Sequence, residues 1–75
     1  MNTDHCLVTN FEGTITIYRG LNLEELIRDV ATAELEYYPE ELASFLSTDT
    51  LDLNNLEYLL EVHDTELYYD APRTY

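Results

Sequence analysis

The chain contains no lysine and no tryptophan, and its 75 residues include only one cysteine, two glycines and two prolines. A single cysteine excludes an internal disulfide and fits a reducing compartment. No apolar run approaches the roughly 20 residues that a membrane-spanning helix needs. No charged segment followed by an apolar stretch predicts a signal peptide. We therefore expect a cytoplasmic protein without membrane contact.

Residues suited to catalysis or metal binding are also scarce. His5-Cys6 and His63-Asp64 are the main candidates, and neither pair has partners at a useful spacing. The acidic stretch DTLDLNNLE at 49–57 lacks the central glycine and alternating ligands of a calcium loop. The chain has no glycine-rich phosphate loop and no basic patch for nucleic acid. We expect no enzyme activity, no cofactor, no metal site and no direct binding of nucleic acid.

Acidic residues are abundant instead. Sixteen Asp and Glu stand against three Arg, for a net charge of −13, whereas small domains usually carry a magnitude of about 2–8. Residues 24–41 carry a net charge of −6 and residues 49–70 carry −7, but residues 1–23 carry only −1. Excess charge of one sign repels itself in the compact state. Solubility does not require this much charge, so we infer that the acids serve binding.

The apolar residues follow a periodic pattern that predicts a folded domain rather than a disordered chain, and 45% of all residues are hydrophobic. Strands are expected at His5–Phe11 and Thr14–Tyr18, with a tight turn at Glu12-Gly13 between them. A two-stranded hairpin is marginal alone in water. We therefore expect the face that carries Ile15 and Ile17 to pack against another element.

Helical segments follow the hairpin. Apolar residues at helical spacing run from Leu23 to Tyr37, with Ala33 on the buried side and Asn22 as the N-cap. Pro39 ends this helix and suits the first turn of a second, shorter one. A third helix is expected at Leu53–Val62.

The sequence predicts an α+β fold made of an N-terminal β-hairpin and two or three short helices. Thr65–Tyr69 alternates like a strand, and whether it completes the sheet as a third strand stays open. The chain is expected to form one small acidic domain over residues 1–75, with frayed ends at 1–4 and 71–75.

Two pairs of tyrosines lie inside acidic segments, in ELEYYPEE at 34–41 and in DTELYYDAP at 64–72. Tyrosine is enriched at binding hot spots, and its ring attracts arginine through a cation–π contact. Helical phase predicts that Tyr37 is buried and Tyr38 exposed. Strand phase predicts that Tyr69 is buried and Tyr68 exposed.

Carboxylates four residues apart on a helix are separated by a rise of about 6 Å. Duplex DNA carries one negative charge per roughly 1.7 Å of axis, so rows of such acids can imitate a phosphate backbone. We expect the surface to attract a basic nucleic-acid-binding protein. The residues expected to bind this partner are Glu24, Glu25, Asp29, Glu34, Glu36, Tyr38, Glu40, Glu41, Glu57, Glu61, Asp64, Glu66 and Tyr68.

In its size, acidity and lack of catalytic motifs, the chain resembles small phage and plasmid proteins that mimic DNA and block host defence, such as anti-CRISPR and anti-restriction proteins. The resemblance covers composition over the whole chain and includes no specific motif. It implies a non-catalytic inhibitor that blocks the access of nucleic acid to its target, such as a Cas effector or a restriction enzyme, in the host cytoplasm if a phage encodes it.

Other functions stay open. One is an acidic adaptor, antitoxin or transcription-modulating protein that binds a basic partner without competing with nucleic acid. Another is a housekeeping domain from a halophile, since halophilic proteins also replace lysine with acid. The near-neutral hairpin leaves open a homodimer formed by β-pairing of its exposed edge.

Overall fold

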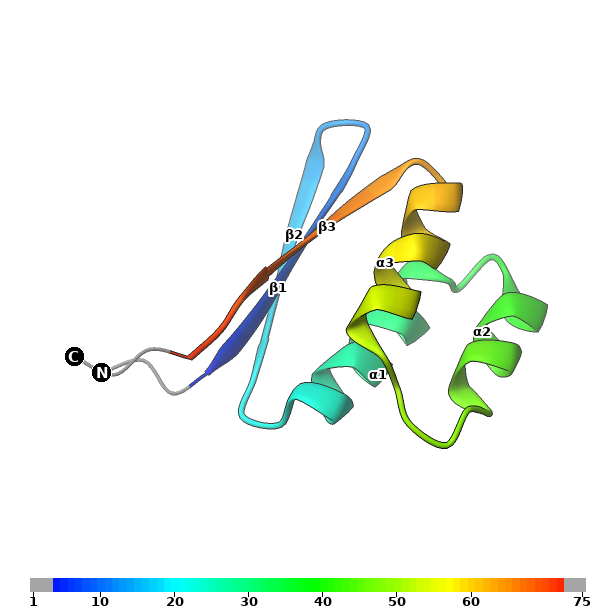
Figure 1. The fold of residues 1–75 in the computed structure, drawn as a ribbon. Coiled ribbons are helices and arrows are strands. Elements are labelled where there is room, and N and C mark those ends of the chain that lie inside the picture. Colours follow the sequence, from blue (N-terminus) through cyan, green and yellow to red (C-terminus); the bar gives the residue numbers. More distant parts are fainter. Residues whose placement is uncertain (1–3, 73–75) are drawn as a thin grey trace.

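The computed structural model describes residues 4–72 and has an α+β fold (Figure 1). The elements, in chain order, are β1 (His5–Phe11), β2 (Thr14–Gly20), α1 (Leu23–Glu34), α2 (Pro39–Leu46), α3 (Leu53–Val62) and β3 (Thr65–Asp70). The predicted hairpin and helices are confirmed, and the third strand is present. Of the ends expected to be frayed, residues 1–3 and 73–75 lie outside the described residues.

The three strands form one antiparallel sheet in the order β2-β1-β3. Glu12 and Gly13 connect β1 to β2 with φ values of 52° and 89°. Two consecutive positive φ values give a turn whose twist matches that of the flanking strands. Because β1 is central, β2 and β3 are both edge strands of the sheet.

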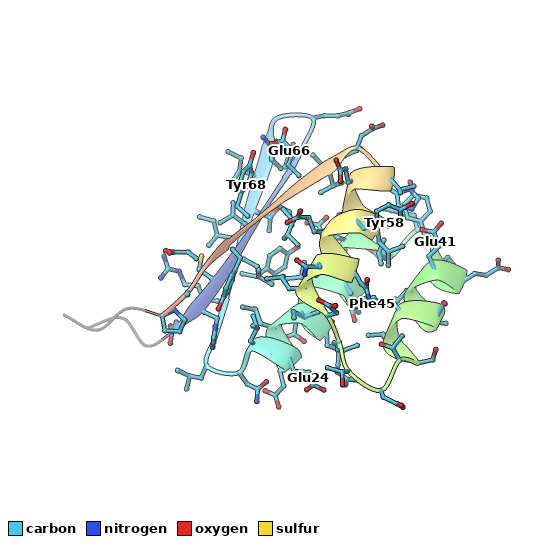
Figure 2. The ribbon with its side chains drawn as sticks, in the orientation of Figure 1. Glu24, Glu41, Phe45, Tyr58, Glu66 and Tyr68 are labelled. Carbon is cyan, nitrogen blue, oxygen red and sulfur yellow. The ribbon has the colours of Figure 1, made fainter. Side chains whose placement is uncertain are left out.

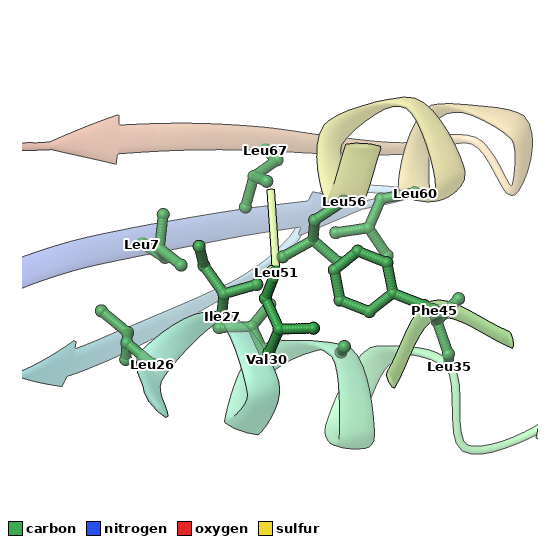
Figure 3. Packing of buried hydrophobic residues seen from close by; sticks show 11 residues of the cluster. Leu7, Leu26, Ile27, Val30, Leu35, Phe45, Leu51, Leu56, Leu60 and Leu67 are labelled. Carbon is green, nitrogen blue, oxygen red and sulfur yellow. The ribbon is translucent and has the colours of Figure 1, made fainter. Parts of the chain in front are cut away.

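Helices α1 and α3 cover one face of the sheet and leave the other face open, and α2 packs against α1 farther from the strands (Figure 1). Leu7 of β1 and Leu67 of β3 point toward the helices and join one apolar cluster (Figure 3). The helices contribute Leu26, Ile27, Val30 and Ala31 from α1, Phe45 from α2, and Leu56 and Leu60 from α3. Burial of a leucine or valine side chain stabilises the fold by about 1.5–3 kcal/mol relative to exposure, so this layer holds the helices on the sheet.

The expectations for Tyr69 of β3 and for the isoleucines of β2 were wrong. Tyr69 is 40% exposed instead of buried, and its ring stacks on His5. Ile15 and Ile17 are 62% and 58% exposed and lie on the open face of the sheet. The face of β2 that the helices cover carries Thr16 and Tyr18, which pair with Thr9 and with the fully buried Leu7. Since the helices pack on the Leu7 side of β1, side-chain alternation places both isoleucines on the opposite side.

The end of α1 also differs from the expectation. The helix ends at Glu34 rather than at Tyr37, and Tyr37 is 85% exposed instead of buried. A residue before proline is disfavoured in helical conformation, and Tyr38, which precedes Pro39, has φ −129° and ψ 63°. The buried face of α1 continues through Ala31 to Leu35, so Ala33 lies on the exposed side.

Candidate functional site

The C-terminal part of the chain folds back on itself between α3 and β3. Asp52 caps α3 by accepting a hydrogen bond from the backbone N–H of Asn54 at 2.9 Å. The chain then reverses at Asp64, whose φ of 61° lies in the left-handed region. Leu60 of α3 and Leu67 of β3 are buried against the same core, which fixes the helix beside the edge strand.

An open cleft of about 450 Å³ lies between α3 and β3. Four carboxylates and one tyrosine border it: Glu57, Glu61, Asp64, Glu66 and Tyr68, together with Thr65 and Leu67. All four acids and Tyr68 belong to the set that the sequence predicts for partner binding. The fold thus brings the C-terminal half of that set around one hollow, with Glu66 and Tyr68 on the strand side (Figure 2).

The electrostatics of this cleft are one-sided. No Lys, Arg or His is among the described residues that line it. Glu57 and Glu61 are exposed and four residues apart on α3, so their carboxylates repel each other across about 6 Å of helix rise. On β3, Tyr68 donates a hydrogen bond to Glu66. This bond and the negative charge of Glu66 raise the pKa of the Tyr68 phenol above its usual value of 10.0.

The N-terminal half of the predicted set is more dispersed. Glu24, Glu25 and Asp29 are exposed around the first turns of α1, where they border a shallow hollow that also contains Arg28. Figure 2 shows Glu24 at the end of the molecule opposite to Glu66 and Tyr68. These acids therefore form a second surface, separate from the cleft and partly neutralised by an arginine.

Glu34 faces inward rather than toward a partner. Its Oε1 accepts hydrogen bonds from the Thr9 hydroxyl at 2.5 Å and from the Tyr18 hydroxyl at 3.1 Å. Thr9 is only 1% exposed, so this carboxylate satisfies a buried donor. Burial and the charge of Glu34 raise the pKa of Tyr18 to about 12. Glu34 links α1 to both strands of the hairpin.

The remaining predicted residues lie near the start of α2. Glu36 is exposed in the turn after α1, and Glu40 is exposed in the first turn of α2. The Tyr38 ring stacks on His63 with 3.7 Å between ring centroids, and the Glu41 carboxylate forms a hydrogen bond with Nε2 of the same histidine. Tyr38 and Glu41 therefore attach α2 to the C-terminal end of α3.

Sequence reasoning missed one aromatic residue, Tyr58. This side chain is 68% exposed on α3. With Glu40, Glu41, Phe45 and neighbouring residues it lines a second hollow of about 400 Å³ between α2 and α3. Helical phase could have identified it, because Leu56 and Leu60 are buried and residue 58 therefore points outward.

Neither a metal-binding cluster nor a membrane-spanning helix is found in residues 4–72. No group of three or more His, Cys, Asp or Glu side chains in this part is arranged to hold a metal ion. Within the same range, no helix is both long and apolar enough to cross a bilayer. No known protein family, curated protein or solved structure matches the chain.

Proposed function

We propose that the protein is a non-catalytic inhibitor that binds a basic nucleic-acid-binding protein and blocks its access to DNA or RNA. The cleft between α3 and β3 carries the proposal. Glu57 and Glu61 lie about 6 Å apart along α3. Glu66 borders the cleft from β3, and Asp64 borders it from the turn between the two elements. Four acids around one hollow, with no cation in its lining, offer a phosphate-like surface.

A groove built to bind nucleic acid carries Lys and Arg, and these side chains are attracted to such a surface. Association is then fast and sensitive to salt. Tyr68 adds a contact that a phosphate backbone lacks, because its exposed ring can stack on an arginine of the partner. The cleft is a better candidate than the α1 surface, since Arg28 partly neutralises the latter.

The class resemblance suggests which partners to test first. Small acidic DNA mimics of phages and plasmids act on defence systems, so a Cas effector or a restriction enzyme in the host cytoplasm is the expected target. The inhibitor would occupy the nucleic-acid groove by steric and electrostatic competition alone. No step in this mechanism needs a catalytic residue or a cofactor.

Capture of host proteins on the immobilised chain tests the mechanism. A nucleic-acid enzyme that binds, and that is released both by salt steps and by a duplex oligonucleotide, would support competition for its groove. A partner that stays bound in high salt and in the presence of the duplex would contradict it. That second result would favour the acidic adaptor or antitoxin function, in which apolar contacts dominate.

A pair of charge-reversal variants locates the contact. The cleft variant Glu57→Lys/Glu61→Lys/Glu66→Lys should weaken capture at least about 100-fold, because three attractive contacts become repulsive. The control Glu24→Lys/Glu25→Lys/Asp29→Lys changes the net charge equally on the opposite surface and should weaken capture far less. Capture by the cleft variant that is as strong as that by the unmodified protein would refute the proposal.

A further inference from the structure

The second edge of the sheet, formed by β2, differs from the rest of the surface. All seven residues of β2 are exposed or half-buried, and the strand contains no acid and no proline. Its only charged residue is Arg19. An edge strand presents unpaired N–H and C=O groups that can pair with another strand unless charge, proline or a covering element prevents it. None of the described elements covers this edge.

We propose that two copies of this chain pair through their β2 strands, antiparallel and across a two-fold axis at Thr16. The sequence around Thr16 is symmetric, with Ile15 on one side and Ile17 on the other. Antiparallel pairing centred there sets Ile15 of one copy opposite Ile17 of the other, twice. A two-fold contact needs a surface that is complementary to itself, and this short segment has that property.

The pairing also extends an apolar row on the open face. Within one copy, Ile17 lies beside Val8, and Val8 lies beside Tyr68, so an apolar row already crosses all three strands. Ile15 and Ile17 are among the most exposed apolar side chains of the described residues. In the paired sheet the isoleucines of both copies contact each other on one face, and their exposed apolar area falls.

Charge favours a second copy at β2 rather than at β3. Pairing through β3 would bring two acidic clefts together, whereas pairing through β2 brings together two acid-free strands. The acid closest to β2 along the chain is Glu12 in the adjoining turn, and the proposed register sets it opposite Gly20 of the second copy, beside that copy's Arg19. Other acids near the strand are those of α1, which packs beneath the hairpin. The two-fold axis makes the two α1 helices antiparallel, so the acids of their first turns lie at opposite ends of the pair. The cleft beside β3 stays open in the dimer.

Sedimentation equilibrium from about 1 μM to about 1 mM tests association. We expect a monomer–dimer equilibrium that strengthens between low salt and about 0.5 M salt, because screening reduces repulsion between the acidic copies. Capture of the basic partner should weaken over the same range, so failure of one proposal is distinguishable from failure of the other. A chain that stays monomeric at all these concentrations and salt levels would overturn the dimer.

Two variants with the same charge change test the surface. Ile17→Lys should raise the dissociation constant of the dimer at least about tenfold, because it places a cation beside the isoleucines of the second copy. Leu21→Lys lies just beyond the strand at a position that is also exposed, and it should change the constant little. An equal effect of both variants would contradict pairing at β2.

Cysteine cross-linking tests the register. In the proposed pairing the two copies of Thr16 face each other, within the 4.4–6.8 Å range of Cα separations that disulfides span. The two copies of Thr14 would be offset by four residues, about 13 Å along the strands. Thr16→Cys should therefore form a covalent dimer on mild oxidation and Thr14→Cys should not, with the unmodified protein and its buried Cys6 as background. Efficient cross-linking by Thr14→Cys but not by Thr16→Cys would refute this pairing.

Discussion

The two edges of the sheet use carboxylates in opposite ways. Beside β3 the acids point outward around an open cleft, and apolar residues lie beneath the strand. Beside β2 the strand itself carries no acid, and the carboxylate of Glu34, which packs against it, is turned inward to Thr9 and Tyr18. The same functional group is thus a surface charge at one edge and part of the folded framework at the other.

This difference separates what an acid does for binding from what it does for stability. A solvated carboxylate among like charges contributes repulsion, so its removal stabilises the fold. A carboxylate that accepts bonds from a buried hydroxyl satisfies a polar group, and its removal leaves that group without a partner. We therefore expect substitutions of acids at the two edges to change stability in opposite directions.

The largest expected effect is that of Glu34→Ala. The substitution leaves the Thr9 hydroxyl, which is nearly fully buried, without its acceptor, and the free energy of unfolding should fall by about 1–3 kcal/mol. Urea denaturation followed by circular dichroism measures it. Glu24→Ala, on the exposed side of the same helix, is the control. Glu34→Gln should lower the free energy of unfolding less than Glu34→Ala does, because it retains a carbonyl oxygen that can accept the bond. If Glu34→Ala and Glu24→Ala lower the free energy of unfolding equally, Glu34 has no special role in stability and the contrast between the two edges fails.

The second prediction concerns alkaline pH at the β2 edge. Burial and Glu34 raise the pKa of Tyr18 to about 12 in the folded state, against 10.0 for the ordinary side chain. The folded protein therefore holds this proton more tightly than the unfolded chain does. The stability from this site is fully present below pH about 10 and is lost as the pH rises through about 12.

Denaturation curves recorded between pH 9 and 12 test this prediction, because Tyr18 titrates over about this interval. Tyr18→Phe should flatten the fall in stability over this interval, because it removes the titrating hydroxyl. Tyr68→Phe changes an exposed tyrosine and should leave most of the fall in place. If Tyr18→Phe follows the same curve as the unmodified protein, the phenol of Tyr18 does not govern the alkaline limit.

Local signals in the sequence predict much of the fold. The bounds of β1 and α3 match the expectation because strand alternation, a turn with glycine and helical spacing are all short-range features. The predictions failed where the outcome depends on distant parts of the chain. Which face of β2 is covered depends on where the helices pack, and the sequence of the hairpin alone does not contain that information. Pro39 restricts only the backbone of Tyr38 directly before it, so it does not account for the end of α1 at Glu34.

The candidate site was predictable only where it depends on short-range spacing along the chain. The spacing of Glu57 and Glu61 on one helix follows from the 3.6-residue period. That Glu66 and Tyr68 border the same cleft depends on the reversal at Asp64 and on the packing of β3 beside α3. The inward position of Glu34 depends on Tyr18, which lies 16 residues away along the chain. No local pattern indicates such a bond.

The third prediction compares acids on two helices. Glu57→Gln/Glu61→Gln removes a like-charge pair from the cleft and should stabilise the fold by about 0.2–0.5 kcal/mol at low salt. Glu24→Gln/Glu25→Gln removes acids from the first turn of α1, where they interact favourably with the helix dipole, and should be destabilising. Thermal or urea unfolding at low ionic strength shows whether each variant is more or less stable than the unmodified protein. Both changes in stability should shrink as salt screens the charges. Changes of the same sign in the two variants would contradict this account of the cleft.

The smallest effect concerns one exposed phenol at the β3 edge. The hydrogen bond from Tyr68 to Glu66 and the charge of that carboxylate raise the pKa of Tyr68 above 10.0. Ultraviolet difference titration of the protein against Tyr68→Phe isolates this residue, and Glu66→Gln should return its pKa toward the ordinary value. Because Tyr68 is exposed, stability at neutral pH should change little in either variant. A Tyr68 pKa that does not respond to Glu66→Gln would mean that the two side chains are not paired in solution. The tyrosine would then be free to stack on an arginine without first breaking a bond at the cleft.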